Sequence, residues 1–351
     1  IRFIGQIGRP KSRRWLFASV STEHHHSIRF HVLVALLRCL HDEALVVDEI
    51  GRLLRILEEQ EYPDLMRLTL ELLESHSLSE KFRPQLSRLL ESPHPSVQKF
   101  ALRKMGEFHT PGVARTLIEQ LGDRDYTRRD AAAHSLQKMP EARSALMKEF
   151  LACDDASKAW SMAELLPSFE GKWRRNILDG VWKRLTKAVE DTDRIQRSYF
   201  QFLKSVAPDF VYTLLSSSGS RLKKAKKYRE AIRYLSLLQE LPAFKVEDKF
   251  LLAVSQLKIR SQAVQSAGRR QNPALELLSD LFRSSTFPLL EALKKEKSLE
   301  PEDMFYLGFT FAEGAAEERT LGRGLLEFLA QRHPRTKTGR NAKNKLKLLA
   351  A

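Results

Sequence analysis

Cysteine and long apolar runs are both scarce in this chain of 351 residues. The two cysteines, Cys39 and Cys153, are too few for a disulfide framework, and neither belongs to a Cys-x-x-Cys pair. We therefore expect a reduced, cytoplasmic setting. The longest apolar stretch, residues 30–40, is shorter than the roughly 20 apolar residues that a membrane-spanning helix needs. The sequence thus predicts neither a disulfide-stapled domain nor a membrane segment.

Recognisable catalytic motifs are also missing. The chain has no Gly-x-Ser-x-Gly elbow, P-loop, dinucleotide-binding fingerprint or His-Glu-x-x-His sequence. His24, His25 and His26, with His31 nearby, are accompanied by no Cys or acidic residue at a zinc-site spacing. We expect these histidines to lie in a solvated loop before a helix, and we predict no catalytic residue, metal or cofactor.

What the sequence does have is helical periodicity along nearly its whole length. Between residues 28 and 40, for example, Val32, Leu33, Leu36 and Leu40 recur at spacings of three and four, which is typical of one buried helix face. Alternating strand patterns with Asn-Gly or Asp-Gly turns are absent. The predicted fold class is all-α.

A repeat runs through these helices. One pattern, a turn residue followed by an amphipathic helix, a break and a second helix, starts again at intervals of roughly 30 to 39 residues. Such a helix pair cannot bury its apolar stripe alone, so stacking of neighbours is required. We therefore predict an α-solenoid of stacked antiparallel helix pairs, with pairs that begin near Ser27, Pro63, Pro95, Tyr126, Asp155 and Arg194.

Two of these copies resemble a known family. Residues 92–106 read SPHPSVQKFALRKMG and residues 122–136 read GDRDYTRRDAAAHSL. Both resemble the short, bacterial type of HEAT repeat, and residues 1–8 look like the tail of an earlier copy. Because that pattern is cut off at Ile1, we expect the chain to be part of a longer protein. The resemblance extends over residues 1–215, and it implies a fold without implying a particular function.

The second part of the chain has a different character. The serine-rich residues 216–220 are predicted to be a linker. Residues 227–235, KYREAIRYL, resemble the second helix of a tetratricopeptide repeat, as does the spacing from Leu307 to Pro334. Gly322 takes the place of the small residue at which the two helices of such a repeat approach closely. We therefore predict tetratricopeptide-like repeats over residues 221–351, with a continued irregular HEAT array as the alternative.

Charge is distributed unevenly. The chain has 59 Lys and Arg against 44 Asp and Glu, a net charge of +15. Residues 41–91 are nonetheless acidic, whereas the start, the predicted junction and the C-terminal end are basic. These clusters are either solvated faces or contacts for phosphates or an acidic protein. The candidate basic contact residues are Arg174, Arg175, Arg221, Lys223, Lys224, Lys226, Lys227, Arg229, Arg335, Lys337, Arg340 and Lys343.

One constellation resembles an enzyme. Asp179 lies between Trp173 and Trp182, next to two arginines, and this is similar to the HEAT-like alkylpurine DNA glycosylases, which use a basic groove with aromatics and an Asp. The two tryptophans are nine residues apart and so fall near opposite faces of one helix. We therefore expect one tryptophan in the core and solvated arginines.

Two functional hypotheses follow. The first is a non-enzymatic scaffold or adaptor that binds another protein or a peptide on a solenoid surface. The second is a nucleic-acid-binding protein of the HEAT-like type, with a glycosylase-like activity as its enzymatic variant, that uses the basic clusters. The sequence identifies neither the partner nor the oligomeric state.

Overall fold

A computed structural model describes residues 10–22, 25–40, 44–59, 62–261, 272–284 and 287–350. Every regular element in these ranges is a helix, which confirms the all-α prediction. None of the helices in the described ranges is both long and apolar enough to cross a membrane. The chain divides into two compact units, residues 1–185 with 194–202 and residues 186–193 with 203–351.

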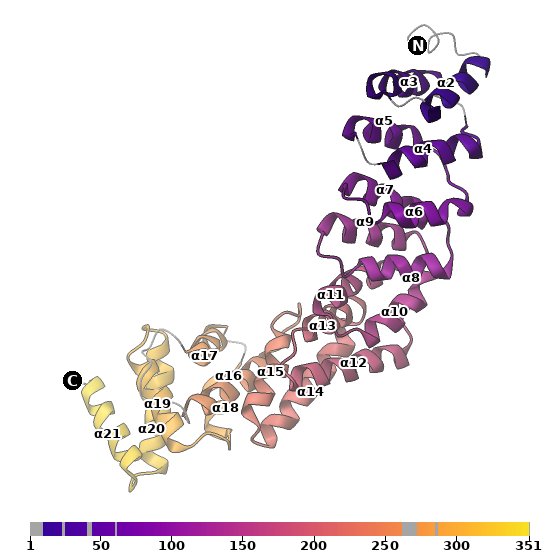
Figure 1. Cartoon of the computed structure of the whole chain (residues 1–351). Coiled ribbons are helices and arrows are strands. Elements are labelled where there is room, and N and C mark those ends of the chain that lie inside the picture. Colours follow the sequence, from indigo (N-terminus) through magenta and orange to yellow (C-terminus); the bar gives the residue numbers. More distant parts are fainter. Residues whose placement is uncertain are drawn as a thin grey trace. The chain divides into compact units, whose positions relative to one another are not determined.

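The first unit consists of two rows of helices (Figure 1). The first-helix row contains α3 (His26–Cys39), α5 (Pro63–Glu74), α7 (Pro95–Gly106), α9 (Tyr126–Gln137) and α11 (Ala156–Leu165). The second-helix row contains α2 (Pro10–Thr22), α4 (Val47–Glu59), α6 (Arg83–Leu89), α8 (Pro111–Gln120) and α10 (Ala142–Ala152). Short 3₁₀ turns, Glu80–Phe82 and Leu166–Ser168, precede α6 and follow α11, while α12 (Arg175–Glu190) and α13 (Gln196–Val206) contribute residues to both units. The stacked helix pairs confirm the predicted solenoid.

The helices of the first-helix row begin where the repeat predicted. Proline occupies the first turn of α5 and α7, where its missing N–H would have no helical partner anyway. Asp125 caps α9 by accepting a hydrogen bond from the Thr127 N–H, and Asp155 caps α11 in the same way. The hydrogen bonds from Thr127 lower the pKa of Asp125, so this cap is ionised at neutral pH.

Neighbouring repeats are joined by apolar packing and by one buried cation. Leu102 of α7 is fully buried, as are Leu117 and Leu136 of the following helices. Lys104 is also buried, and its Nζ donates to the backbone oxygens of Glu74 and His76 at 2.9 and 2.8 Å and to the Glu107 carboxylate. The lysine thereby satisfies carbonyls at the C-terminal end of α5 that have no helical partner.

The second unit continues the succession of helices. It contains α14 (Pro208–Lys224), α15 (Tyr228–Leu238), α16 (Val246–Ser261), α17 (Pro273–Arg283), α18 (Leu289–Lys295), α19 (Pro301–Ala312), α20 (Glu318–Arg332) and α21 (Lys337–Ala350). From α16 onward they share one apolar core that includes Leu278, Leu307 and Leu325. Whether these helices are tetratricopeptide-like stays a prediction.

Residues 216–220 correct one expectation, because they are not a linker. They lie inside α14, which runs without interruption from Pro208 to Lys224. A Cβ on Gly219 would lie 2.5 Å from the Leu235 side chain, so the glycine allows α14 and α15 to pack closely. Ser216 donates to the Asp248 carboxylate of α16 at 2.7 Å. The small polar residues that suggested a flexible segment are therefore used for helix packing.

Candidate functional site

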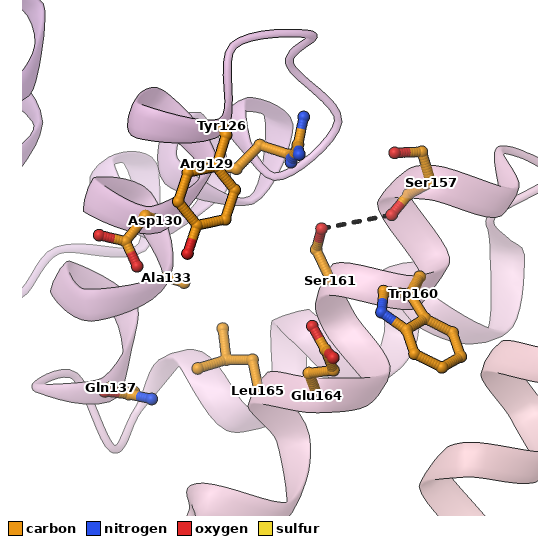
Figure 2. Close-up of a pocket in the computed structure, with 10 residues that line it drawn as sticks. All are labelled: Tyr126, Arg129, Asp130, Ala133, Gln137, Ser157, Trp160, Ser161, Glu164 and Leu165. Carbon is orange, nitrogen blue, oxygen red and sulfur yellow. Dashed lines mark hydrogen bonds between the residues drawn. The ribbon is translucent and has the colours of Figure 1, made fainter.

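A groove of about 330 Å³ lies between α9 and α11 in the first-helix row. Figure 2 shows the residues of α9 on one side and those of α11, which ends at Leu165, on the other. The lining residues are Tyr126, Arg129, Asp130, Ala133, Gln137, Ser157, Trp160, Ser161, Glu164 and Leu165.

The groove exists because α9 packs more closely against α7 than against α11. Gly106 of α7 and Ser135 of α9 meet where a Cβ on the glycine would lie only 2.7 Å from the serine Cβ. The Ser135 hydroxyl also donates to the Leu102 carbonyl at 3.1 Å, which fixes this crossing. On the side of α9 that faces α11, the small side chain of Ala133 leaves space next to Leu165 of α11.

Two aromatic side chains at the groove are exposed. Tyr126, at the first residue of α9, exposes 69% of its surface, and Trp160 of α11 exposes 40%. A tryptophan is usually highly buried in a folded domain, because its apolar ring gains free energy on leaving water. Rings of this size at a groove therefore offer apolar area to a binding partner.

The charged groups of the groove differ in whether they already have hydrogen-bond partners. Arg129 donates to the Asp123 and Arg124 carbonyls at 2.7 and 3.0 Å and lies over the Tyr126 ring. The carboxylates of Asp130 and Glu164 are exposed and have no hydrogen-bond or ion-pair partner within the described ranges. The Arg129 guanidinium therefore already donates hydrogen bonds within the chain, whereas both carboxylates are available to form an ion pair with a cation of a binding partner.

The groove is lined by few kinds of titratable group. Its titratable groups are carboxylates, an arginine and a tyrosine, and they include neither a histidine nor a cysteine. The part of the chain that the structure describes contains no group of three His, Cys, Asp or Glu residues that could hold a metal ion.

The histidines and the basic start are only partly described. His24 lies outside the described residues, as do Arg2, Arg9 and the copy expected at residues 1–8. His26 is in the first turn of α3 rather than in a loop, and its Nε2 lies 2.9 Å from both carboxylate oxygens of Asp64. This hydrogen bond lowers the pKa of Asp64. The contact joins successive helices of the first-helix row.

Trp173, Arg175 and Asp179, which resemble a glycosylase site in the sequence, contact other residues of the first unit. The Arg143 guanidinium lies 4.0 Å from the centre of the Trp173 ring, and the Trp173 and Phe202 rings pack in a T-shaped arrangement. Arg175 Nε donates to the Asp179 carboxylate at 3.2 Å, and both side chains are largely exposed. Arg174 is exposed as well. Asp179 is therefore part of a surface ion pair along one helix.

The predicted junction cluster contains one residue that is not on the surface. Lys223 is buried, and its Nζ donates to the Glu296 carboxylate at 2.6 Å, which corrects its assignment to a contact surface. Lys227 is exposed and pairs with Glu230 at 3.3 Å. The other members of the cluster are exposed at the end of α14 and the start of α15, namely Arg221, Lys224, Lys226 and Arg229.

The C-terminal cluster is exposed throughout. Arg335 lies in the turn before α21, and Lys337, Arg340 and Lys343 belong to that helix. None of these four side chains has an ion-pair partner among the residues that the structure describes. Their predicted role in contacts stays a prediction.

Comparison with known proteins agrees with the repeat pattern. The family model described as HEAT repeats matches residues 50–137 and residues 82–164. Residues 50–164, which include α9 and all but the last residue of α11, therefore consist of HEAT repeats, and this confirms the resemblance where it is strongest. The match does not extend to residues 221–351. No curated protein matches the chain.

The groove between α9 and α11 is not among the features that the sequence predicts. In the repeat pattern Tyr126 marks only the start of a helix, and Trp160 belongs to no recognisable motif. The available signal was a tryptophan on the polar face of a short amphipathic helix, between Ser157, Ser161 and Glu164. A polar-face tryptophan is unusual enough to indicate a binding surface.

Proposed function

We propose that the chain is a non-enzymatic scaffold that holds a segment of another protein in the α9–α11 groove. HEAT repeats are generally protein-interaction motifs, and stacked repeats present extended surfaces for this purpose. The observation that carries the proposal is the exposure of Tyr126 and Trp160 beside one groove within the HEAT repeats. Burial of such rings supplies much of the binding energy at protein interfaces.

The charges of the groove favour a partner segment with a Lys or Arg side chain. Asp130 and Glu164 each offer an open carboxylate, and their opposite charge would attract that side chain. The face of Trp160 adds a cation–π contribution of about 0.5 to 2 kcal/mol for a cation placed over that ring, whereas Arg129 already lies over the ring of Tyr126. We therefore assign the groove to a basic peptide segment.

A peptide-display selection on the immobilised protein tests this function. We expect the selected peptides to share a Lys or Arg next to an apolar residue. Trp160→Ala should weaken their binding by tenfold or more, since truncation of a central aromatic commonly costs about 2 kcal/mol. Trp15→Ala is the matched control, because Trp15 is exposed to a similar extent, 48%, but lies outside the groove.

Charge reversal gives a second and sharper readout. In Glu164→Lys the groove would repel the basic side chain, so selected peptides should lose affinity while variants with Glu in place of their Lys or Arg should regain it. The proposal fails if Trp160→Ala and Trp15→Ala bind equally well, or if the wild-type protein selects acidic peptides.

We further propose a cytoplasmic location, because Cys39 and Cys153 are the only cysteines of the sequence and neither is part of a disulfide. Burial raises the pKa of the Cys153 thiol, so this cysteine is an unreactive part of the core.

A further inference from the structure

Helix α21 presents a stripe of positive charge to solvent. Lys337, Arg340, Lys343 and Lys347 are all exposed, and α21 contains no acidic residue. The surrounding region is similar, since residues 319–351 hold nine Lys and Arg against a single Glu. This region therefore contributes +8 of the net charge of +15.

The four cations share one face of the helix. At 100° per residue they fall within about one third of the circumference and span about 15 Å along the axis. The opposite face carries Thr338, Gly339 and Ala342, which are buried. Figure 1 shows α21 next to α20, and Arg323 of α20 donates to the Leu349 carbonyl at 2.9 Å. The contacts of α21 with the rest of the second unit thus determine which face of the helix is exposed to solvent.

Several other cations of the second unit are neutralised by ion pairs. Lys223 pairs with Glu296 at 2.6 Å, Lys258 with Asp303 at 2.8 Å and Arg283 with Glu318 at 3.0 Å. The same holds on α21 itself, where Lys345 pairs with Glu313 and lies over the ring of Phe309.

The stripe differs from these paired residues. None of Lys337, Arg340, Lys343 and Lys347 has an ion-pair partner within the described ranges. Like charges at spacings of three and four repel each other in a helix by a few tenths of a kcal/mol per pair. A surface that only confers solubility would intersperse acidic residues and so avoid that cost. The unneutralised stripe is therefore suited to a polyanion.

We propose that α21 binds the phosphate backbone of duplex nucleic acid, independently of the α9–α11 groove. The length of the stripe matches the axial rise of about four phosphates of one strand. Asn341 and Asn344 are exposed next to the stripe and can donate hydrogen bonds to phosphate oxygens. The stripe carries no aromatic side chain on which unpaired bases could stack, which favours a duplex over a single strand.

The experiment measures fluorescence anisotropy of a labelled DNA duplex, and of an RNA duplex of the same sequence, over a salt series. The test variant is Arg340→Gln/Lys343→Gln/Lys347→Gln. The control is Arg67→Gln/Lys99→Gln/Arg115→Gln, which removes three exposed charges from α5, α7 and α8. All six side chains are exposed, so both variants should keep the wild-type far-UV circular dichroism spectrum.

We expect the wild-type chain to bind a duplex more weakly as salt rises. At low salt the α21 variant should bind at least about tenfold more weakly than the wild type. The slope of log affinity against log salt concentration should be smaller in magnitude by about 3, because three phosphate contacts are lost. The control should retain wild-type affinity within about twofold, because its charges belong to the first unit and none of them is part of the stripe. Comparison of the two duplexes shows whether DNA or RNA is preferred.

Three results would overturn the proposal. One is the absence of binding to either duplex at low salt. Another is an equal loss in the control variant, which would assign the binding to net charge alone. The third is tighter binding of poly-glutamate than of a duplex with the same number of charges, which would assign the stripe to an acidic protein.

Discussion

Replacement of Gly322 by alanine is expected to disrupt the packing of α19 against α20. A Cβ at this position would collide with the backbone nitrogen of Ala312. It would also lie 2.7 Å from the Ala312 Cα and 2.8 Å from the Gly308 oxygen. All three obstacles are backbone atoms of α19, so no change of side-chain rotamer can relieve the collision. One helix must move away from the other.

The size of the effect follows from two opposing contributions. Alanine is favoured over glycine inside a helix by about 1 kcal/mol, and this alone would stabilise the variant. Overpacking of a close contact costs about 1 to 3 kcal/mol, with the upper part of that range expected where backbone must shift. We therefore expect Gly322→Ala to reduce the free energy of unfolding by about 2 kcal/mol.

Gly180→Ala is the matched control. This glycine lies inside α12, and a Cβ there would meet only Leu151, at 4.0 Å. The helix-propensity gain should appear undiminished, so we expect stabilisation of up to about 1 kcal/mol. The same substitution should thus have opposite signs at the two positions.

Urea unfolding followed by far-UV circular dichroism measures both effects. Because the chain divides into two compact units, unfolding can depart from two states, so each variant is compared with the wild type over the whole transition. An unfolding midpoint for Gly322→Ala equal to or above that of the wild type would refute the described crossing of α19 and α20.

Three further predictions concern burial and pH. Leu102→Ala should lower the free energy of unfolding by about 2 to 5 kcal/mol in urea, since the side chain is fully buried; an unchanged midpoint would contradict its place in the core. Lys104→Met should cost about 3 kcal/mol in the same assay, because two carbonyls at the end of α5 lose their donor; a neutral result would mean that water replaces the ammonium. Burial raises the pKa of Glu296, but hydrogen bonds from Lys223 and Ser298 outweigh it and leave that pKa below its usual 4.5. A lowered pKa stabilises the fold above pH 4.5 and the effect fades as pH falls below it, so the stability gap between wild type and Glu296→Gln should be full at neutral pH and shrink in acid.

Much of the first unit could be predicted, because residues close together in the sequence mark where each helix of the repeat begins. Each predicted start in the first-helix row lies in or next to a helix. Pro63 and Pro95, which marked two of these starts, occupy the first helical turn, and Asp155, which marked another, caps its helix. The close approach at Gly322 was also predictable, since a glycine within an apolar helix pattern has few other uses. These features depend on residues that are near one another in the chain.

The linker and the groove could not be predicted because they depend on packing between helices. Ser216 and Gly219 look like a flexible segment until the contacts with Asp248 and Leu235 are known. The charge of Lys223 likewise looks exposed until Glu296, 73 residues later, is placed beside it. The groove forms because α11 stands off from α9, a distance that no single helix sequence encodes.

The buried lysine of α7 makes the repeats non-interchangeable. Lys104 reaches back to the end of α5, and its equivalent in the next repeat, 31 residues on, is Ser135, which instead bonds to Leu102 and meets Gly106. Removal of one whole repeat would bring α9 against α5, where the short serine cannot reach the carbonyls that the lysine serves. The repeats share one architecture, but the contacts between successive repeats differ from one interface to the next. Exchange or removal of a repeat should therefore destabilise this array, whereas an array of identical consensus repeats would tolerate the same change.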